Sequence, residues 1–236
     1  MELEAMANFL PDFSGVLLDM DGLVLDSEVS YVRAWENAAL ELGHPLEPGF
    51  ARSLFGRHAG DVAFEFKKFF GPGFDAEVFF RLAERHWFKG IEENGVAPMP
   101  GITQLLSCLQ ERGIPYALAT NSDRPYADLC LERSGLLTAF PLTIARDEVK
   151  RGKPEPDLFL GAAKLLGLPA SNCLVLEDSE TGLDAAKASG AVAVLIQRQD
   201  QLRDKLSPKA HLVFSDLVAF RSVLVQSGPH FRNAPP

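Results

Sequence analysis

The stretch Val16-Leu17-Leu18-Asp19-Met20-Asp21-Gly22 decides the fold that we expect for this chain. Its first three residues are apolar without alternation, which is typical of a short strand buried on both faces. Residues two apart on an extended chain point the same way, so Asp19 and Asp21 leave the end of this strand side by side. In open α/β sheets, ligands bind at that end of the strands. A strand-ending turn with a helix cap would account for these residues equally well, so the rest of the chain must decide.

The composition limits the classes of partner and compartment. With 236 residues, 47% of them hydrophobic, the chain can form one large domain or a core with a smaller insert. A net charge of −9 without a basic stripe argues against nucleic acid and anionic membranes as partners. No apolar run approaches the roughly 20 residues of a membrane span. The three cysteines are scattered, which is typical of reduced thiols, and the first segment is acidic, unlike the basic start of a signal peptide. We therefore expect a cytoplasmic protein.

Residues 28–97 have the pattern of a helical insert. Apolar residues at helical spacing predict helices over residues 28–42, 61–70 and 75–93, and Gly71-Pro72-Gly73 separates the last two. Ten aromatic residues fall between positions 55 and 88. We interpret these aromatic residues as the core of the insert rather than as a platform for stacking on a sugar.

From residue 98 onward, strand and helix patterns alternate, which predicts a doubly wound parallel sheet of the Rossmann-like α/β class. Residues 1–27 and 98–236 would form this core, and residues 28–97 would form an all-helical cap. Because the cap is inserted at the carboxyl end of a strand, it is a candidate lid over the active site. The expected strands cover residues 116–120, 142–145, 173–176, 191–196 and 212–214, and the expected helices cover residues 102–112, 126–133, 156–166, 182–188 and 216–225.

Polar residues follow three further segments of this core. Thr120 ends one strand and is followed by Asn121, and the acid pair Glu177-Asp178 follows another strand. Lys153 lies in a stiff loop between Gly152 and Pro154. Taken separately, the segment after Thr120 could be a helix cap at Ser122 or Asp123, and Lys153 could be an ordinary solvated lysine.

Taken together, these residues predict a cation site. The carboxyl ends of parallel strands meet at one edge of the sheet, so the two acid pairs, the hydroxyl and the lysine should lie close together. Four carboxylates facing one lysine require a further cation. Carboxylate oxygens suit Mg²⁺, which also bridges to phosphate, so we expect Mg²⁺ as the cofactor.

The same four segments resemble, in order and in spacing, the four motifs of the haloacid-dehalogenase-like hydrolase superfamily. The matching residues are Asp19-Met20-Asp21-Gly22, then Thr120, then Lys153 within Gly-Lys-Pro-Glu-Pro-Asp, and finally Glu177-Asp178-Ser179 with Gly182. The resemblance spans residues 15–196. The position of the insert is similar to that of the helical-cap subfamily I, which includes β-phosphoglucomutase-like proteins and sugar-phosphate phosphatases.

The resemblance implies a role for each motif residue. Asp19 would attack phosphorus and form an aspartyl-phosphate, and Asp21 would act as general acid and then as general base. Phosphate oxygens would bind to Thr120, Asn121 and Lys153. The ligands of Mg²⁺ would be the Asp19 carboxylate, the Asp21 carbonyl, Asp178, and Glu177 either directly or through water.

The resemblance therefore implies a phosphoric monoester hydrolase, a Mg²⁺-dependent phosphatase of small phosphate monoesters, with sugar phosphates favoured. One alternative is a phosphomutase of the β-phosphoglucomutase type. Hexose mutases carry a histidine and a basic residue at positions where this chain has Tyr31 and Ala59, with Arg57 and His58 nearby. Dehalogenases and phosphonate hydrolases lack the second acid, Asp21. An alternative of another class is a non-catalytic phosphate-binding or receiver-like signalling protein, although receiver domains are about half this length and have no helical insert.

Specificity for the leaving group is expected in the cap, because the core residues bind only the phosphate. The candidates are Glu28, Tyr31, Arg57 and His58. The expected partner is a small phosphorylated metabolite, with neither nucleic acid nor membrane involved, and the expected state is a monomer or a weak homodimer.

Overall fold

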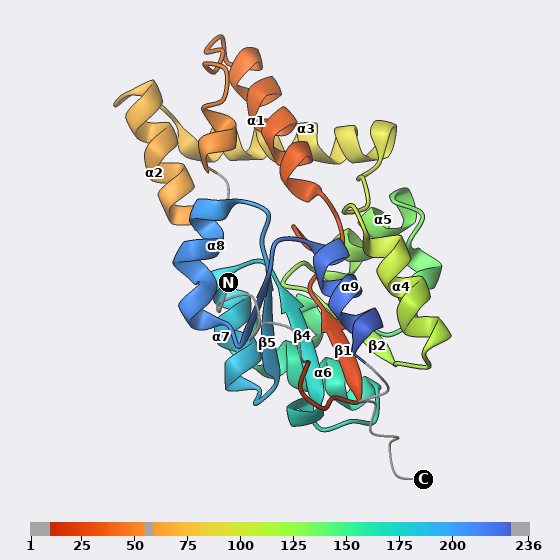
Figure 1. Cartoon of the computed structure of the whole chain (residues 1–236). Coiled ribbons are helices and arrows are strands. Elements are labelled where there is room, and N and C mark those ends of the chain that lie inside the picture. The colour runs from red at the N-terminus through yellow and green to blue at the C-terminus, as the bar shows by residue number, and fades with distance from the viewer. Residues whose placement is uncertain (1–9, 55–58, 228–236) are drawn as a thin grey trace. The chain divides into compact units, whose positions relative to one another are not determined.

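The computed structural model describes residues 10–54 and 59–227, with the main chain alone at residues 28 and 59–61 (Figure 1). The chain divides into two compact units. One consists of residues 10–25 and 98–227, and the other of residues 26–97. Each unit is described by itself.

The larger unit contains a parallel sheet of six strands in the order β3-β2-β1-β4-β5-β6. The first strand of the chain is central and pairs with β2 on one side and β4 on the other, so that Leu17 lies beside Ala117 and Val175. This confirms the Rossmann-like α/β class. The strands are β1 (Gly15–Leu18), β2 (Tyr116–Ala119), β3 (Thr143–Ile144), β4 (Cys173–Glu177), β5 (Val192–Ile196) and β6 (Leu212–Phe214).

Helices cover both faces of this sheet, which explains why its central strands are apolar without alternation. Leu17 packs in one cluster with Phe159 of α6 and Leu183 of α7, while Val16 and Leu18 point to the other face and are equally buried. Right-handed crossovers place α4 and α5 on that other face, where α9 packs against α4 (Figure 1). The helices of this unit are α4 (Ile102–Glu111), α5 (Arg124–Arg133), α6 (Asp157–Leu165), α7 (Glu180–Ala188), α8 (Asp200–Leu206) and α9 (Leu217–Gln226).

One helix of this unit is absent from the sequence prediction. The helix α8 has only seven residues, and its two apolar residues are Leu202, which is partly buried, and Leu206, which is buried. Two apolar residues are too few to establish a helical period in the sequence. Most of the other boundaries fall within two residues of the predicted ones. None of the helices in the described part of the chain is long and apolar enough to cross a membrane.

The smaller unit is helical, and its core is aromatic. Phe66 is fully buried, with its ring centroid 4.5 Å from that of Phe79 and 5.5 Å from that of Trp35. Asp75 begins the last helix by accepting a hydrogen bond from the Val78 N–H at 3.1 Å. The helices are α1 (Ser27–Glu41), α2 (Ala59–Phe70) and α3 (Ala76–Asn94), with a 3₁₀ turn at Ala51–Leu54.

Candidate active site

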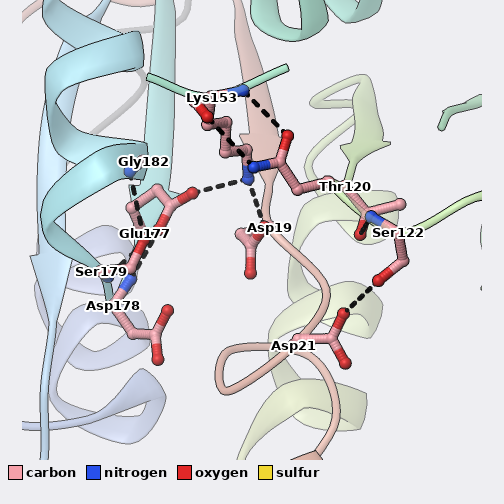
Figure 2. Close-up of polar contacts among 10 residues, drawn as sticks. Asp19, Asp21, Thr120, Ser122, Lys153, Glu177, Asp178, Ser179 and Gly182 are labelled. Atoms are coloured by element: carbon pink, nitrogen blue, oxygen red, sulfur yellow. Dashed lines mark hydrogen bonds and ion pairs between the residues drawn. The ribbon is translucent and has the colours of Figure 1, made fainter. Parts of the chain in front are cut away.

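The carboxyl edge of the sheet gathers the residues that the sequence singled out in the core. Asp19 follows β1, Thr120 follows β2, and Glu177 with Asp178 ends β4, while Lys153 reaches in from the loop before α6 (Figure 2). All of these residues belong to the larger unit. The structure therefore brings together residues that lie more than 150 positions apart in the chain.

Lys153 is a buried cation shared by two acids. Its side chain is only 3% exposed, and its ammonium forms ion pairs with the carboxylates of Asp19 and Glu177, the latter at 2.6 Å (Figure 2). The ammonium also lies 4.8 Å from the centroid of the Phe159 ring. These contacts exclude the alternative of a solvated surface lysine.

Burial and charge shift the pKa values of this pair. Burial, reinforced by the nearby charge of Glu177, raises the pKa of Asp19 to about 8 against the opposing effect of Lys153. For Lys153, burial opposes the charged form, but Asp19 and Glu177 together raise its pKa above the ordinary value. The lysine therefore stays protonated. A further positive charge beside Asp19 would stabilise the ionised form of its carboxylate.

Glu177 is completely buried and saturated with donors. One carboxylate oxygen binds Lys153, and the other accepts hydrogen bonds from the N–H groups of Asp178 and Ser179 at 3.1 and 3.2 Å and from the Ser179 hydroxyl at 2.9 Å. A Cβ on Gly182 would lie 1.9 Å from the Glu177 carboxyl carbon, so only glycine fits there. Glu177 is therefore better placed to hold Lys153 than to bind a metal directly.

The carboxylates gathered at this edge of the sheet fit a divalent cation, with Asp19 and Asp178 better placed than Glu177 to bind it directly. Asp19, Glu177 and Asp178 each offer a carboxylate oxygen, and these atoms all lie within 4.8 Å of one another. Gly22, at φ +83°, allows this approach, because a Cβ there would lie 2.1 Å from an Asp178 carboxylate oxygen. An all-oxygen set of this kind suits Mg²⁺.

Two hydroxyl groups, whose contact with Asp21 was not predicted from the sequence, bind its carboxylate. The Ser122 hydroxyl donates to one carboxylate oxygen at 2.9 Å, and the Tyr126 hydroxyl donates to the other at 3.3 Å. Both donors come from the segment that follows Thr120 and enters α5. The only feature of the sequence that could have indicated these contacts is that three hydroxyl residues, Thr120, Ser122 and Tyr126, follow one strand closely.

Thr120 and Asn121 have different surroundings. Thr120 is buried, and its hydroxyl oxygen accepts a hydrogen bond from the Ser122 N–H at 3.0 Å. The Asn121 amide instead binds the main chain of Lys153, accepting from its N–H at 2.8 Å and donating to its carbonyl at 3.2 Å. The predicted contact of Asn121 with phosphate stays a prediction.

The four cap candidates are only partly described. Tyr31 lies in α1, is 37% exposed, and stacks on Trp87 with ring centroids 5.6 Å apart. Arg57, His58 and the side chain of Glu28 lie outside the described residues. The predicted role of all four in binding substrate therefore stays a prediction.

Comparisons with known proteins agree on one family. A family model described as haloacid dehalogenase-like hydrolase matches residues 13–190. Hexitol phosphatase A from Escherichia coli (strain K12) is 32% identical over 182 residues, covering 77% of this chain and 82% of that protein. Fructose-1-phosphate phosphatase YqaB from Escherichia coli (strain K12) is 29% identical over 182 residues, covering 77% of this chain and 95% of that protein. The crystal structure of a HAD family hydrolase from Deinococcus radiodurans R1, with bound phosphate and sodium, is similar with a TM-score of 0.76 and 27% sequence identity. The similarity covers 95% of this chain and 100% of that one.

Proposed function

This chain belongs to the haloacid dehalogenase-like hydrolases and is a phosphatase, and on that premise we propose that it hydrolyses sugar phosphates through an aspartyl-phosphate on Asp19, with Mg²⁺. The observation that carries the proposal is the buried contact of Asp19 with Lys153, beside Asp178 and two residues before Asp21. The proposal is supported by the meeting of two acids, a buried lysine and a further carboxylate at one edge of the sheet.

The proposed reaction has two displacements at phosphorus. In the first, a carboxylate oxygen of Asp19 bonds to phosphorus, the bond to the sugar oxygen breaks, and Asp21 gives that oxygen a proton. In the second, Asp21 takes a proton from water as the water oxygen bonds to phosphorus and the bond to Asp19 breaks. Inorganic phosphate leaves, and both carboxyl groups return to their starting state.

Charge stabilisation comes from the residues around Asp19. The ammonium of Lys153 and the hydroxyl of Thr120 would bind the phosphate oxygens, whose negative charge spreads as the bonds change. The Asp19 and Asp178 carboxylates and the Asp21 carbonyl would hold Mg²⁺, with Glu177 at most through water. When bound, the metal supplies positive charge to a phosphate oxygen and to the Asp19 carboxylate.

The names of two relatives support a hydroxylated leaving group, since one is a hexitol phosphatase and the other a fructose-1-phosphate phosphatase. We assign the recognition of this group to the cap candidates Glu28, Tyr31, Arg57 and His58.

The three cysteines, Cys108, Cys130 and Cys173, are buried and free, which supports a reducing compartment such as the cytoplasm.

The direct test is phosphate release from a panel of hexose, pentose, hexitol and nucleoside phosphates, measured with Mg²⁺ and with a chelator. We expect chelator-sensitive release that is fastest for one or two sugar phosphates. Interconversion of hexose 1-phosphate and 6-phosphate without release would favour the phosphomutase instead. Equal release with and without chelator would contradict the metal assignment.

Asp178→Asn is expected to raise the Mg²⁺ concentration needed for half-maximal activity by about tenfold or more, because an amide is a weaker ligand than a carboxylate. The measurement is a Mg²⁺ titration of turnover. The matched control is Asp184→Asn, which changes an acid of α7 that pairs with Lys209 at 2.7 Å. An Asp178→Asn titration that overlays the control would count against Asp178 as a ligand.

A further inference from the structure

We infer that Asn121 is a positioning residue, whose side-chain amide determines where the Lys153 ammonium lies. The inference rests on the proposed function only in that Lys153 is taken to bind phosphate. The Asn121 amide binds both polar groups of the Lys153 main chain, although the two residues are 32 positions apart. The two hydrogen bonds together restrain both the position and the rotation of the Lys153 backbone.

The loop is built to allow this contact. A Cβ on Gly152 would lie 2.4 Å from Oδ1 of the Asn121 side-chain amide and 2.6 Å from Cδ of Arg146. Any other residue at position 152 would therefore push the Asn121 amide or the loop aside. The close approach of these two segments requires glycine at this position.

The position of the backbone matters because the Lys153 side chain has little room to compensate. Its stem is buried, and its ammonium must reach Asp19 and Glu177 at once. A shift of the loop by about 1 Å would stretch one of these two contacts, and misplacement on that scale can cost a factor of about 100 in rate. The exposed loop ion pairs of Arg151, at 2.9 Å to Glu155 and 2.8 Å to Asp157, are too solvated to replace the amide.

The first experiment measures the reactivity of Lys153, which does not depend on any activity. The protein is treated with a limiting amount of an amine-acylating reagent, and modification is measured by peptide mass spectrometry, with Lys209 as an internal reference. Asn121→Ala is expected to raise the labelling rate of Lys153 about tenfold, because the buried ammonium becomes accessible. Arg151→Ala, the control variant from the same loop, should leave that rate within about twofold. An unchanged Lys153 rate in Asn121→Ala would overturn the inference.

The second experiment asks whether Asn121 acts through Lys153 or touches phosphate itself. Binding of inorganic phosphate in the presence of Mg²⁺ is measured by calorimetry for the unaltered protein, Asn121→Ala, Lys153→Met and the double variant. We expect Asn121→Ala to weaken binding about tenfold in the unaltered background and less than about twofold in the Lys153→Met background. A full tenfold loss in both backgrounds would overturn the inference, because the amide would then bind phosphate directly.

The two experiments also separate this inference from the proposed function. If the unaltered protein binds no phosphate while Asn121→Ala still increases Lys153 labelling, the proposed function fails and the positioning role stands. If Asn121→Ala does not fold, Gly152→Ala displaces the same amide without removing it and is expected to increase Lys153 labelling equally. No increase in a folded Gly152→Ala protein would contradict the inference.

Discussion

Asp19→Asn is expected to lower turnover by about ten-thousandfold or more, while leaving the fold intact. An asparagine amide cannot form the bond to phosphorus, and removal of a single member of a catalytic group commonly costs this much. The measurement is phosphate release from the best substrate of the panel at saturating Mg²⁺. In the unaltered protein, acid quenching followed by mass spectrometry should trap a phosphoryl group on Asp19.

Stability provides the control for this substitution. Because burial raises the pKa of Asp19 to about 8, the ionised carboxylate is disfavoured in the folded protein at neutral pH. A neutral amide avoids that cost, and Lys153 keeps its contact with Glu177. We therefore expect the variant to melt no lower than the unaltered protein without metal. Substantial Mg²⁺-dependent turnover in a folded Asp19→Asn protein would refute Asp19 as the nucleophile.

Lys153→Met is expected to reduce both activity and stability. It leaves the fully buried carboxylate of Glu177 without its cation, and breaking a buried ion pair from one side costs about 3 kcal/mol or more in the free energy of unfolding. Turnover should fall about a hundredfold or more, because a cation aimed at the phosphate is lost. Denaturant unfolding and steady-state kinetics measure the two effects.

The matched control is Lys209→Met, which makes the same chemical change at an exposed lysine. Lys209 pairs with Glu180 at 3.0 Å and with Asp184 at 2.7 Å, but all three side chains are well exposed to solvent. Exposed pairs contribute little, so this control should leave turnover and stability nearly unchanged. Equal losses of stability in the two variants would mean that the buried position of Lys153 has no special importance.

Much of the larger unit could be predicted because its patterns are local. Apolar runs followed by acids or hydroxyls located β1, β2 and β4 and the residues at their ends, and the rule that parallel strands present their carboxyl ends at one edge brought Asp19, Thr120 and Glu177 together. The helix α8 was not predicted, because its seven residues include only two apolar ones, Leu202 and Leu206, which are too few to establish a period. In the smaller unit, the aromatic residues between positions 55 and 88 indicated a core, and Phe66 and Phe79 are indeed fully buried.

Side-chain partners were beyond the reach of the same reasoning. Ser122 and Tyr126 bind Asp21 across more than 100 positions of the chain, and no pattern in either segment indicates the pairing. Asn121 follows Thr120 at the end of a strand, and both were predicted to bind phosphate; that the Asn121 amide binds the Lys153 main chain could not be predicted from that position. Strand ends indicate which residues meet but not the direction of each side chain.

By itself, the sequence determined the class of fold, the edge of the sheet that bears the site, and the chemical groups available there. These follow from local periodicity and from residue type, since a buried strand must be apolar and the acids at its end must lie in a solvated or compensated place. Only the tertiary structure decided that Lys153 is shared between Asp19 and Glu177, that Glu177 is saturated with donors, and that glycine is required at positions 22 and 182. Such choices depend on distances of a few ångströms between segments far apart in the chain, and those distances exist only once the helices and strands have packed.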